Sequence, residues 1–525
     1  MHLSNGMRSL DLNSVEILYI YGLGLGFDFE PLKGWLEEKK ERQLVLIEDD
    51  LAVSSIFMQA ALAQLFHHPR LHLHFIPRAK KWRSSLRQLA QAFPSDRIAF
   101  TSLHAYPKAS KRKIAEMRLF MHKETARLNI LYSEILNSHR LFSNIYSNFK
   151  RLSESFLINH FKGRFADIPA IICGAGPSLT SAIPVLKQCE DRALIFAGGS
   201  TITALGAEQV QPHLCVAIDP NPLEYERLKG AQAFQTPFIF IARLFPSLFS
   251  LLNGPFGYMR SSMAVAIEKS LGSQLNLGEE LIGSRLNSEA LSVTTLTIAL
   301  AHYMGCNPII LSGVDLAFTN KQCYAKGVDH SVSFNPSQKA SRSIDQWIRK
   351  KDREGKPLYT RVGWMMEASA IDAYVRAHPE TLFINSTEGG LGFSDINYLP
   401  LDKVIEKYGT RFYDLHALLQ TEIEAARLDA SLSKQAEEWF QELSHSLERM
   451  NRIVEEMEIH QNSGKRVVLE MDFQEEFAFH HLFQAVDKVL ERLTQNSPEA
   501  TLPEKLHHYK LMIKSYLETL RANVK

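Results

Sequence analysis

The feature that most constrains the fold is a repeated alternation of short apolar runs with amphipathic stretches. In a first series, from Val15 to about Pro107, we predict strands at "VEILYIYG", "RQLVLIED", "LHLHFIP" and "RIAFTS". Between them, "FEPLKGWLEEKKE" and "SSIFMQAALAQLFHH" have the apolar spacing of helices. Strands that alternate with helices predict a parallel, doubly wound sheet. A basic helical segment, which begins with "KASKRK", then leads to about residue 150.

A second series of the same kind runs from Ala170 to about Pro400. Its predicted strands are "AIIC", "ALIFA", "LCVAI", "FIFIA", "PIILS" and "TLFI", and each ends in a short polar or glycine-containing loop. From about Leu401 the strands stop, and apolar residues recur at helical spacing over many turns.

The predicted fold class is therefore α/β, with two Rossmann-like domains and a C-terminal helical domain. We place the N-terminal Rossmann-like domain and its linker helix at residues 1–145. The central Rossmann-like domain takes residues 146–400, and the helical domain takes 401–525. In open sheets of this class, ligands bind beyond the carboxyl ends of the strands, so the loops there are where we expect the chemistry.

Composition is that of a globular protein with balanced charge. The 525 residues exceed one ordinary core, which agrees with two or three domains. The formal net charge of +1 gives no reason to expect nucleic acid as a partner. The five cysteines have no C-x-x-C spacing, which disfavours a disulfide framework or a zinc site. The N-terminal "MHLSNGMRSLDLNSVE" has no signal-peptide core, and no run of about 18 uncharged apolar residues occurs. We expect a cytoplasmic protein without a membrane span.

The loop in "AIICGAGPSLT" is typical of a site for a nucleotide phosphate. Glycines at Gly174 and Gly176 let the backbone approach a ligand, Pro177 suits the first helical position, and Ser178 adds a hydroxyl donor. Leu179 replaces the third glycine of a dinucleotide motif, and the next strand ends in glycines rather than in an acid. NAD and FAD are therefore not expected. A plain tight turn is the alternative.

The N-terminal "YGLGLGFDFEPL" resembles the first loop of a methyltransferase, and Glu48 ends the next predicted strand, where a ribose-binding acid would stand. A glycine turn without a ligand fits equally well. Because no downstream methyltransferase motif follows, we predict that this domain binds no S-adenosylmethionine. "LHLHFIP" alternates as a half-exposed strand does, and no Cys or acid completes a ligand set with His67, His68, His72 and His74. We predict no metal ligands in the chain.

Polar side chains follow three further strands of the second series. Asp219 comes directly after "LCVAI", Asp315 after "PIILSGV", and "NSTEGG" from Asn385 after "TLFI". Tyr324, Lys326 and His330 follow Asp315 within a short glycine-containing stretch. Each feature alone fits a cap or a turn. Together they predict a pocket for a charged, hydroxyl-rich ligand.

These stretches carry a family resemblance. "CGAGPSL", "PHLCVAIDP", "VTTLTIALAHYMGCNPIILSGVDLAFT", "YAKG" and "INSTEGG" together resemble the motility accessory factor (Maf) family, whose central domain is shared with the 6-hydroxymethylpterin diphosphokinase MptE-like proteins. The resemblance is strongest over about 165–395. It implies a cytoplasmic glycosyltransferase that moves a nonulosonic acid, of the pseudaminic or legionaminic type, from a CMP-sugar to Ser or Thr of flagellin. It also implies a fold similar to bacterial sialyltransferases.

On this interpretation each candidate residue receives a role. The nucleotide is assigned to Gly174, Gly176, Pro177 and Ser178, its base or ribose to Ser200 and Asp219, and the sugar hydroxyls to Asn385, Thr387 and Glu388. Asp315 and His330 are the first candidates for the base that takes the acceptor's proton, and Glu388 is the next. We expect no tightly bound cofactor and leave a requirement for Mg²⁺ open.

Two other functions remain open at this point. An ATP-dependent diphosphokinase acting on a pterin would use Asp219 and Asp315 to bind Mg²⁺. A non-catalytic protein would keep the fold to dock a partner. The acceptor is also open, since the long helical tail could serve a protein other than flagellin.

Overall fold

The structure is a computed structural model, and it describes residues 11–24, 30–59, 68–76, 82–103, 107–231, 235–286, 292–328, 342–461, 463–495 and 502–522. The chain forms two compact units. Unit 1 comprises Met1–Tyr132, Asn335–Ile348 and Arg361–Met366. Unit 2 comprises Ser133–Phe334, Arg349–Thr360 and Glu367–Lys525. The three-domain division at residues 145 and 400 remains a prediction.

Unit 1 is built on a four-stranded parallel sheet of order β3-β2-β1-β4. Its strands are β1 (Ile17–Tyr21), β2 (Gln43–Glu48), β3 (Leu71–Phe75) and β4 (Ile98–Ser102). Its helices are α2 (Glu30–Glu38), α3 (Leu51–Gln59), α4 (Trp82–Ala92) and most of α5 (Pro107–Leu136). Every residue of β1 is buried, as expected for a central parallel strand that is covered on both faces.

The loops at the carboxyl edge of this sheet are held by Glu48. This carboxylate is fully buried, and it accepts hydrogen bonds from the N–H groups of Leu23 (3.0 Å), Asp49 (2.9 Å) and Asp50 (2.9 Å). Glu48 therefore fixes the turn that begins the "YGLGLG" motif. The latter part of the motif lies outside the described residues.

Unit 2 contains an eight-stranded sheet of order β14-β11-β6-β7-β8-β9-β10-β5, in which every strand pair is parallel. Its strands are β5 (Ser155–Leu157), β6 (Ala170–Cys173), β7 (Leu194–Gly198), β8 (Leu214–Ala217), β9 (Phe238–Phe240), β10 (Phe256–Tyr258), β11 (Ile309–Ser312) and β14 (Phe383–Asn385). A separate two-stranded sheet pairs β12 (Trp347–Lys351) with β13 (Pro357–Arg361).

Alternate residues of each central strand enter different cores. Ile171 and Cys173 of β6 pack with α6 (Ser138–Phe149), α7 (Leu179–Leu186), α8 (Ser200–Ala207), α9 (Pro222–Leu228) and α10 (Ala266–Gln274). Ala170 and Ile172 face a second core with α11 (Val293–Tyr303) and α12 (Val362–Ala377). Short 3₁₀ turns lie at Leu12–Ser14, Leu152–Glu154, Ile158–Phe161, Pro246–Leu251 and Ser343–Asp345.

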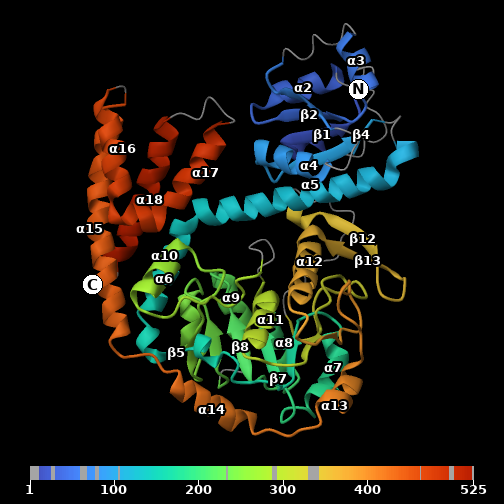
Figure 1. Cartoon of the computed structure of the whole chain (residues 1–525), viewed down its shortest axis with the longest axis vertical. Helices are drawn as coiled ribbons and strands as arrows, with labels where there is room; N and C mark the ends of the chain where they lie inside the picture. Colours follow the sequence, from blue (N-terminus) through green and yellow to red (C-terminus); the bar gives the residue numbers. More distant parts are fainter. Residues whose placement is uncertain are drawn as a thin grey trace. The chain divides into compact units, whose positions relative to one another are not determined.

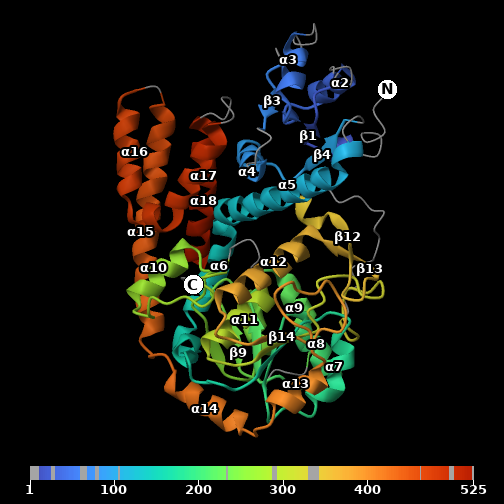
Figure 2. The same cartoon turned by 45° about the vertical axis from the view of Figure 1, so that its right-hand side comes forward.

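The C-terminal part is helical: α13 (Leu401–Tyr408), α14 (Leu415–Ala425), α15 (Leu432–Ile459), α16 (Lys465–Glu475), α17 (Gln484–Gln495) and α18 (Leu502–Ala522). Helices α15 to α18 stand together as a bundle in Figures 1 and 2. The bundle joins the core of unit 2 through aromatic contacts, since Phe142 of α6 packs edge-on against Phe440 and Tyr516. The predicted fold class, two Rossmann-like α/β parts with a C-terminal helical part, is confirmed.

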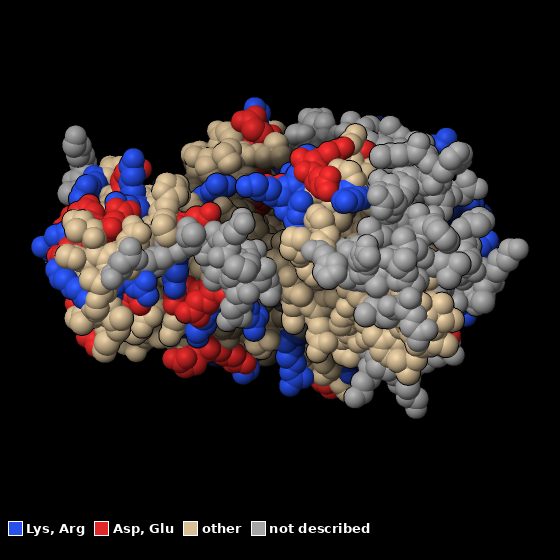
Figure 3. All heavy atoms as spheres, turned by 90° about the horizontal axis from the view of Figure 1, so that it is seen from above, with Lys and Arg blue, Asp and Glu red and all other residues tan. Residues whose placement is uncertain are grey.

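Surface charge and helix hydropathy bear on the predicted partners. On the face shown in Figure 3, basic and acidic side chains are interspersed, which fits the formal net charge of +1. Across the described ranges, no helix combines the length and the apolar character needed to cross a bilayer.

In β3, His72 contacts the side-chain oxygen of Gln43 at 2.8 Å through Nε2, and His67 lies outside the described residues.

Candidate functional site

Three predicted loops meet at the carboxyl edge of the large sheet. Strands β14, β11 and β6 are neighbours and run parallel, so the loops that follow them lie side by side. These loops are Gly174–Ser178, Gly313–Asp315 and Ser386–Gly390. The structure thus brings together most of the residues that the sequence assigns to the site.

Asp315 is the point where these loops join. Its side chain is 2% exposed. Its Oδ1 accepts hydrogen bonds from the hydroxyl (2.5 Å) and the N–H (3.3 Å) of Ser178, and its Oδ2 accepts one from the hydroxyl of Thr319 (2.6 Å). Burial raises the pKa of Asp315, although the hydrogen bonds from Ser178 and Thr319 oppose that rise. Both carboxylate oxygens are therefore engaged within the protein.

The glycines of the site allow the loops to approach one another closely. A Cβ added at Gly176 would lie 2.1 Å from Oδ1 of Asp315, and one at Gly174 would lie 2.5 Å from the carbonyl oxygen of Gly313. Gly390 has a φ of +82°, and a Cβ there would lie 2.2 Å from the carbonyl oxygen of Asp315. Any larger residue would force the three loops apart.

Three residues of the predicted phosphate loop, Gly174, Gly176 and Ser178, donate hydrogen bonds within the protein. The N–H of Gly174 donates to Ser312 (2.7 Å) and that of Gly176 to Gly313 (2.8 Å), both on the neighbouring strand-loop segment. Pro177 has no N–H, and Ser178 donates to Asp315. The loop after β6 therefore packs closely against the loop after β11, and its glycines make this close approach possible.

The loop after β14 is also tied to the loop after β11. Thr387 accepts the N–H of Val314 at 3.1 Å through its hydroxyl, and its own N–H donates to the side-chain oxygen of Asn385 at 3.0 Å. Asn385 and Thr387 are buried, whereas Glu388 is exposed. Gly389 follows Glu388, and a Cβ added there would lie 3.3 Å from Oδ2 of Asp315. Glu388 is thus an exposed acid whose neighbour in the chain, Gly389, approaches Asp315.

The "YAKG" segment crosses the same edge. The N–H of Ala325 donates to the carbonyl oxygen of Ala175 at 2.8 Å, which places the segment over the loop after β6. Gly327, with a φ of +93°, packs against Ala207 of α8, where an added Cβ would lie 2.8 Å from the Ala207 Cβ. Lys326 is exposed. His330 lies outside the described residues, so its role remains a prediction.

A second polar group follows β7 and β8. Ser200 begins α8 and is half-buried, and Asp219 accepts hydrogen bonds from the N–H (3.0 Å) and side-chain amide (2.6 Å) of Asn221. Arg227 lies between two acids, 3.7 Å from Asp219 and 3.3 Å from Glu224. Burial, and next the charge of Asp219, raise the pKa of Glu224. The sequence analysis did not single out Glu224 and Arg227. A signal was present, because Glu224 lies three residues after Asn221 and Arg227 three residues after Glu224, the spacing of neighbours on a helix.

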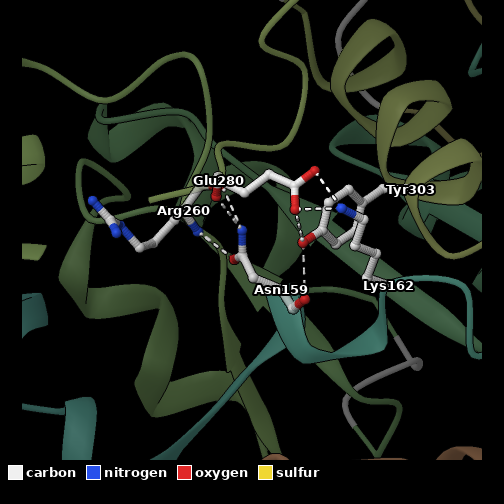
Figure 4. A network of polar contacts seen from close by, with 5 residues as sticks. All are labelled: Asn159, Lys162, Arg260, Glu280 and Tyr303. Atoms are coloured by element: carbon white, nitrogen blue, oxygen red, sulfur yellow. Dashed lines mark hydrogen bonds and ion pairs between the residues drawn. The ribbon is translucent and has the colours of Figure 1, made fainter. Parts of the chain in front are cut away.

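A third network, drawn in Figure 4, fixes the backbone that follows β10. The side-chain amide of Asn159 donates to the carbonyl oxygens of Arg260 and Glu280, both at 3.1 Å, and its oxygen accepts the Arg260 N–H at 2.9 Å. Lys162 pairs with Glu280 at 2.7 Å, but both side chains are more than half exposed, so the pair stabilises little. The Arg260 side chain points away from these residues.

Glu268 is a buried acid that sequence reasoning also missed. Its side chain is 2% exposed, and it accepts the N–H groups of Ala242 and Val265, each at 3.2 Å. Burial raises the pKa of Glu268 to about 7, although these backbone hydrogen bonds and Arg243 oppose the rise. Glu268 is the N3 residue of α10, so it also caps that helix.

Comparisons with known proteins agree with this fold. Residues 139–321 match the family model described as 6-hydroxymethylpterin diphosphokinase MptE-like. A search of curated proteins found no significant relative. The chain is similar to the solved structure of the MAf glycosyltransferase from Magnetospirillum magneticum AMB-1, with a TM-score of 0.51 and 17% identity over 97% of this chain and 78% of that chain. At this identity the likeness shows the fold.

The resemblance inferred from the motifs is therefore confirmed at this level. The centre of the chain carries an MptE-like domain, and the chain as a whole shares the fold of that Maf protein.

Proposed function

We propose that this chain, which carries an MptE-like domain on a Maf-like fold, is a glycosyltransferase. In this proposal it transfers a nonulosonic acid of the pseudaminic or legionaminic type from a CMP-sugar to a Ser or Thr hydroxyl of a flagellin-like protein. The observation that carries the proposal is the meeting of three strand-end loops at Asp315, in a sheet whose carboxyl edge is the expected ligand side.

The transfer needs a group that receives the leaving nucleotide, a rigid frame for the sugar and a base for the acceptor hydroxyl. Gly174, Gly176 and Pro177 form the floor on which the nucleotide would lie. Ser200 and Asp219, which follow the next two strands along the edge, would contact its base or ribose. Buried Asn385 and Thr387 would set the position of the loop that faces the sugar.

The described candidates for the base that accepts the acceptor's proton differ in their exposure to solvent. Asp315 has both oxygens occupied by hydroxyl donors and is buried, so it suits a positioning role that orients Ser178 and Thr319. Glu388 is exposed and precedes Gly389, which approaches Oδ2 of Asp315, so its side chain is open to solvent near this edge. Glu388 and His330 are therefore the residues proposed to accept the proton, and Asp315 the residue that holds the site in shape.

A thermal-shift panel tests the donor class. We expect CMP to raise the melting temperature more than CDP, UDP, ATP or S-adenosylmethionine does, since a ligand that binds only the folded state stabilises it in proportion to its occupancy. Each nucleotide is run with and without Mg²⁺, so that a metal requirement is read separately. Transfer of the sugar from CMP-pseudaminic or CMP-legionaminic acid to flagellin, followed by mass spectrometry, tests the reaction itself.

The family-model match favours a second function, the ATP- and Mg²⁺-dependent diphosphokinase. It would require Asp219 and Asp315 to bind Mg²⁺ through free oxygens. The geometry favours it less, because Asp315 accepts two hydroxyl donors and Asp219 holds Asn221. Selective stabilisation by ATP with Mg²⁺ would replace the glycosyltransferase by this function. A panel without any nucleotide response would support a non-catalytic binding protein.

A further inference from the structure

A separate cluster of histidines lies at the C-terminal ends of α11 and α12. His302 is the next-to-last residue of α11, and His378 and Glu380 follow the last residue of α12. One potential ligand atom from each of the three residues lies within 4.8 Å of the others. His378 is 7% exposed, and the side chains of His302 and Glu380 are 23% and 61% exposed. One donor residue, His378, is thus buried, His302 is half-buried, and Glu380 is exposed.

Tyr374 orients both imidazole rings. Nδ1 of His378 lies 2.8 Å from the carbonyl oxygen of Tyr374. A carbonyl only accepts, so this nitrogen carries the proton and Nε2 keeps its lone pair. Nδ1 of His302 contacts the Tyr374 hydroxyl at 2.9 Å, which leaves Nε2 on the side of Glu380, 3.4 Å from Oε1. Histidines that bind metals hold their second nitrogen in this way.

We propose that His302, His378 and Glu380 form a binding site for a divalent transition metal of the zinc class. Two imidazole nitrogens and one carboxylate oxygen are a typical protein ligand set for Zn²⁺, and the exposure of Glu380 leaves room for a water as the fourth ligand. Mg²⁺ and Ca²⁺ prefer sites made of oxygen atoms, so this set disfavours them. The ligands are far apart in sequence, which is why spacing motifs do not reveal them.

In this proposal the metal site stabilises the fold and takes no part in the proposed glycosyl transfer. The other end of α11 reaches the functional edge, since a Cβ added at Gly198 at the end of β7 would lie 2.4 Å from Val293. The 11 residues of α11 span about 16 Å at 1.5 Å a residue. The metal would therefore join α11 to the segment after α12 at a distance from Asp315, and this assignment does not depend on the proposed function.

The test uses the full chain, first freed of metal with a chelator and then titrated with Zn²⁺ by calorimetry. We expect one equivalent to bind and to raise the melting temperature, and Mg²⁺ to have neither effect. Titration with Co²⁺ should give the visible bands of a four-coordinate site. His302→Ala and Glu380→Gln should each weaken Zn²⁺ binding by at least about tenfold.

Two controls make the result decisive. His445→Ala removes an exposed histidine from α15 and should leave the affinity unchanged. Glu380 is exposed, so Glu380→Gln tests the site even where a histidine variant does not fold. Absence of Zn²⁺ binding by the wild-type chain, or equal affinity in the wild type, His302→Ala and Glu380→Gln, would overturn the site. Loss of the CMP-induced thermal shift after chelation would overturn its purely structural role.

Discussion

The hydroxyl of Ser178 donates a hydrogen bond to Oδ1 of Asp315 across 2.5 Å, between residues that are 137 positions apart in the sequence. The bond joins the loop after β6 to the loop after β11, two neighbouring strands of the large sheet. Ser178 is thereby a support for Asp315 at least as much as a donor for a ligand.

The first prediction concerns this bond. Ser178→Ala should lower the free energy of unfolding by about 1–3 kcal/mol, because a buried carboxylate loses one of its two hydroxyl donors. Urea denaturation measures the change. Ser181→Ala is the matched control, since Ser181 lies in the helix that begins directly after Ser178, is exposed and donates to the Ser178 carbonyl oxygen. Equal stability of both variants would show that the Ser178–Asp315 bond contributes nothing.

The second prediction concerns the close approach at Gly176. A methyl group there would lie 2.1 Å from Oδ1 of Asp315 and 2.6 Å from the Gly313 carbonyl oxygen. Gly176→Ala should therefore cost about 1–3 kcal/mol of stability and abolish the thermal shift by CMP. Gly230→Ala introduces the same methyl group into open space and should retain that shift. A CMP shift of wild-type size in Gly176→Ala would contradict the packing role.

Much of the fold follows from the sequence, because buried parallel strands are short apolar runs between helices. All four strands predicted in the first series and all six in the second occur as β1–β4, β6–β9, β11 and β14. The strands β5 and β10 escaped prediction, because "SFL" and "FGY" lack the unbroken apolar run that marks the equally short β9. The charged "WIRKK" of β12 has no apolar run, so it escaped as well.

The candidate site was less predictable. The sequence analysis placed Asp315, Ser178 and Thr387 after the ends of strands, because the alternation of apolar runs with amphipathic stretches shows where each strand ends. It could not show that the Ser178 hydroxyl bonds to Asp315 or that Thr387 holds Val314, since both contacts depend on strand order. The altered pKa of Glu268 could not be predicted from the sequence, because an acid in the first turn of a helix is typical of an ordinary cap. The pKa is raised by burial, which only the structure shows.

The third prediction uses that altered pKa. The folded-state pKa of Glu268, about 7, exceeds its ordinary value of 4.5. Between these values the unfolded chain ionises while the folded chain keeps its proton, so stability falls as pH rises from about 4.5 to 7 and then levels off. Glu268→Gln should remove this part of the pH dependence, as measured by urea denaturation from pH 4 to 8. Glu279→Gln, at an exposed acid, should keep it.

The fourth prediction concerns the N-terminal glycine motif. Both oxygens of Glu48 already accept backbone N–H groups, so the carboxylate is not available for the ribose of S-adenosylmethionine. Calorimetry should detect no binding tighter than about millimolar. Tight binding that disappears in Glu48→Gln would reopen the methyltransferase interpretation.

The fifth prediction separates positioning from proton transfer. Asp315→Asn, Glu388→Gln and His330→Ala should each remain folded and keep the CMP-induced thermal shift. Asp315→Asn should lose transfer by roughly a hundredfold or more, because the carboxylate that holds the hydroxyls of Ser178 and Thr319 is lost. Replacing the residue that acts as the base should lower the rate of transfer by as much. Replacing the other candidate should leave the rate nearly unchanged.

The pH profile of the reaction identifies which of the two candidates is the base. Carboxyl groups of model peptides titrate well below pH 6 and model imidazoles near about 6.5, so the two classes of base give different profiles between pH 6 and 8. A rate that changes little over this range favours Glu388. A rate that falls as pH drops, and a His330→Ala variant that loses both this fall and most of the activity, favour His330. Full turnover in both Glu388→Gln and His330→Ala would exclude both residues and return the role of base to Asp315.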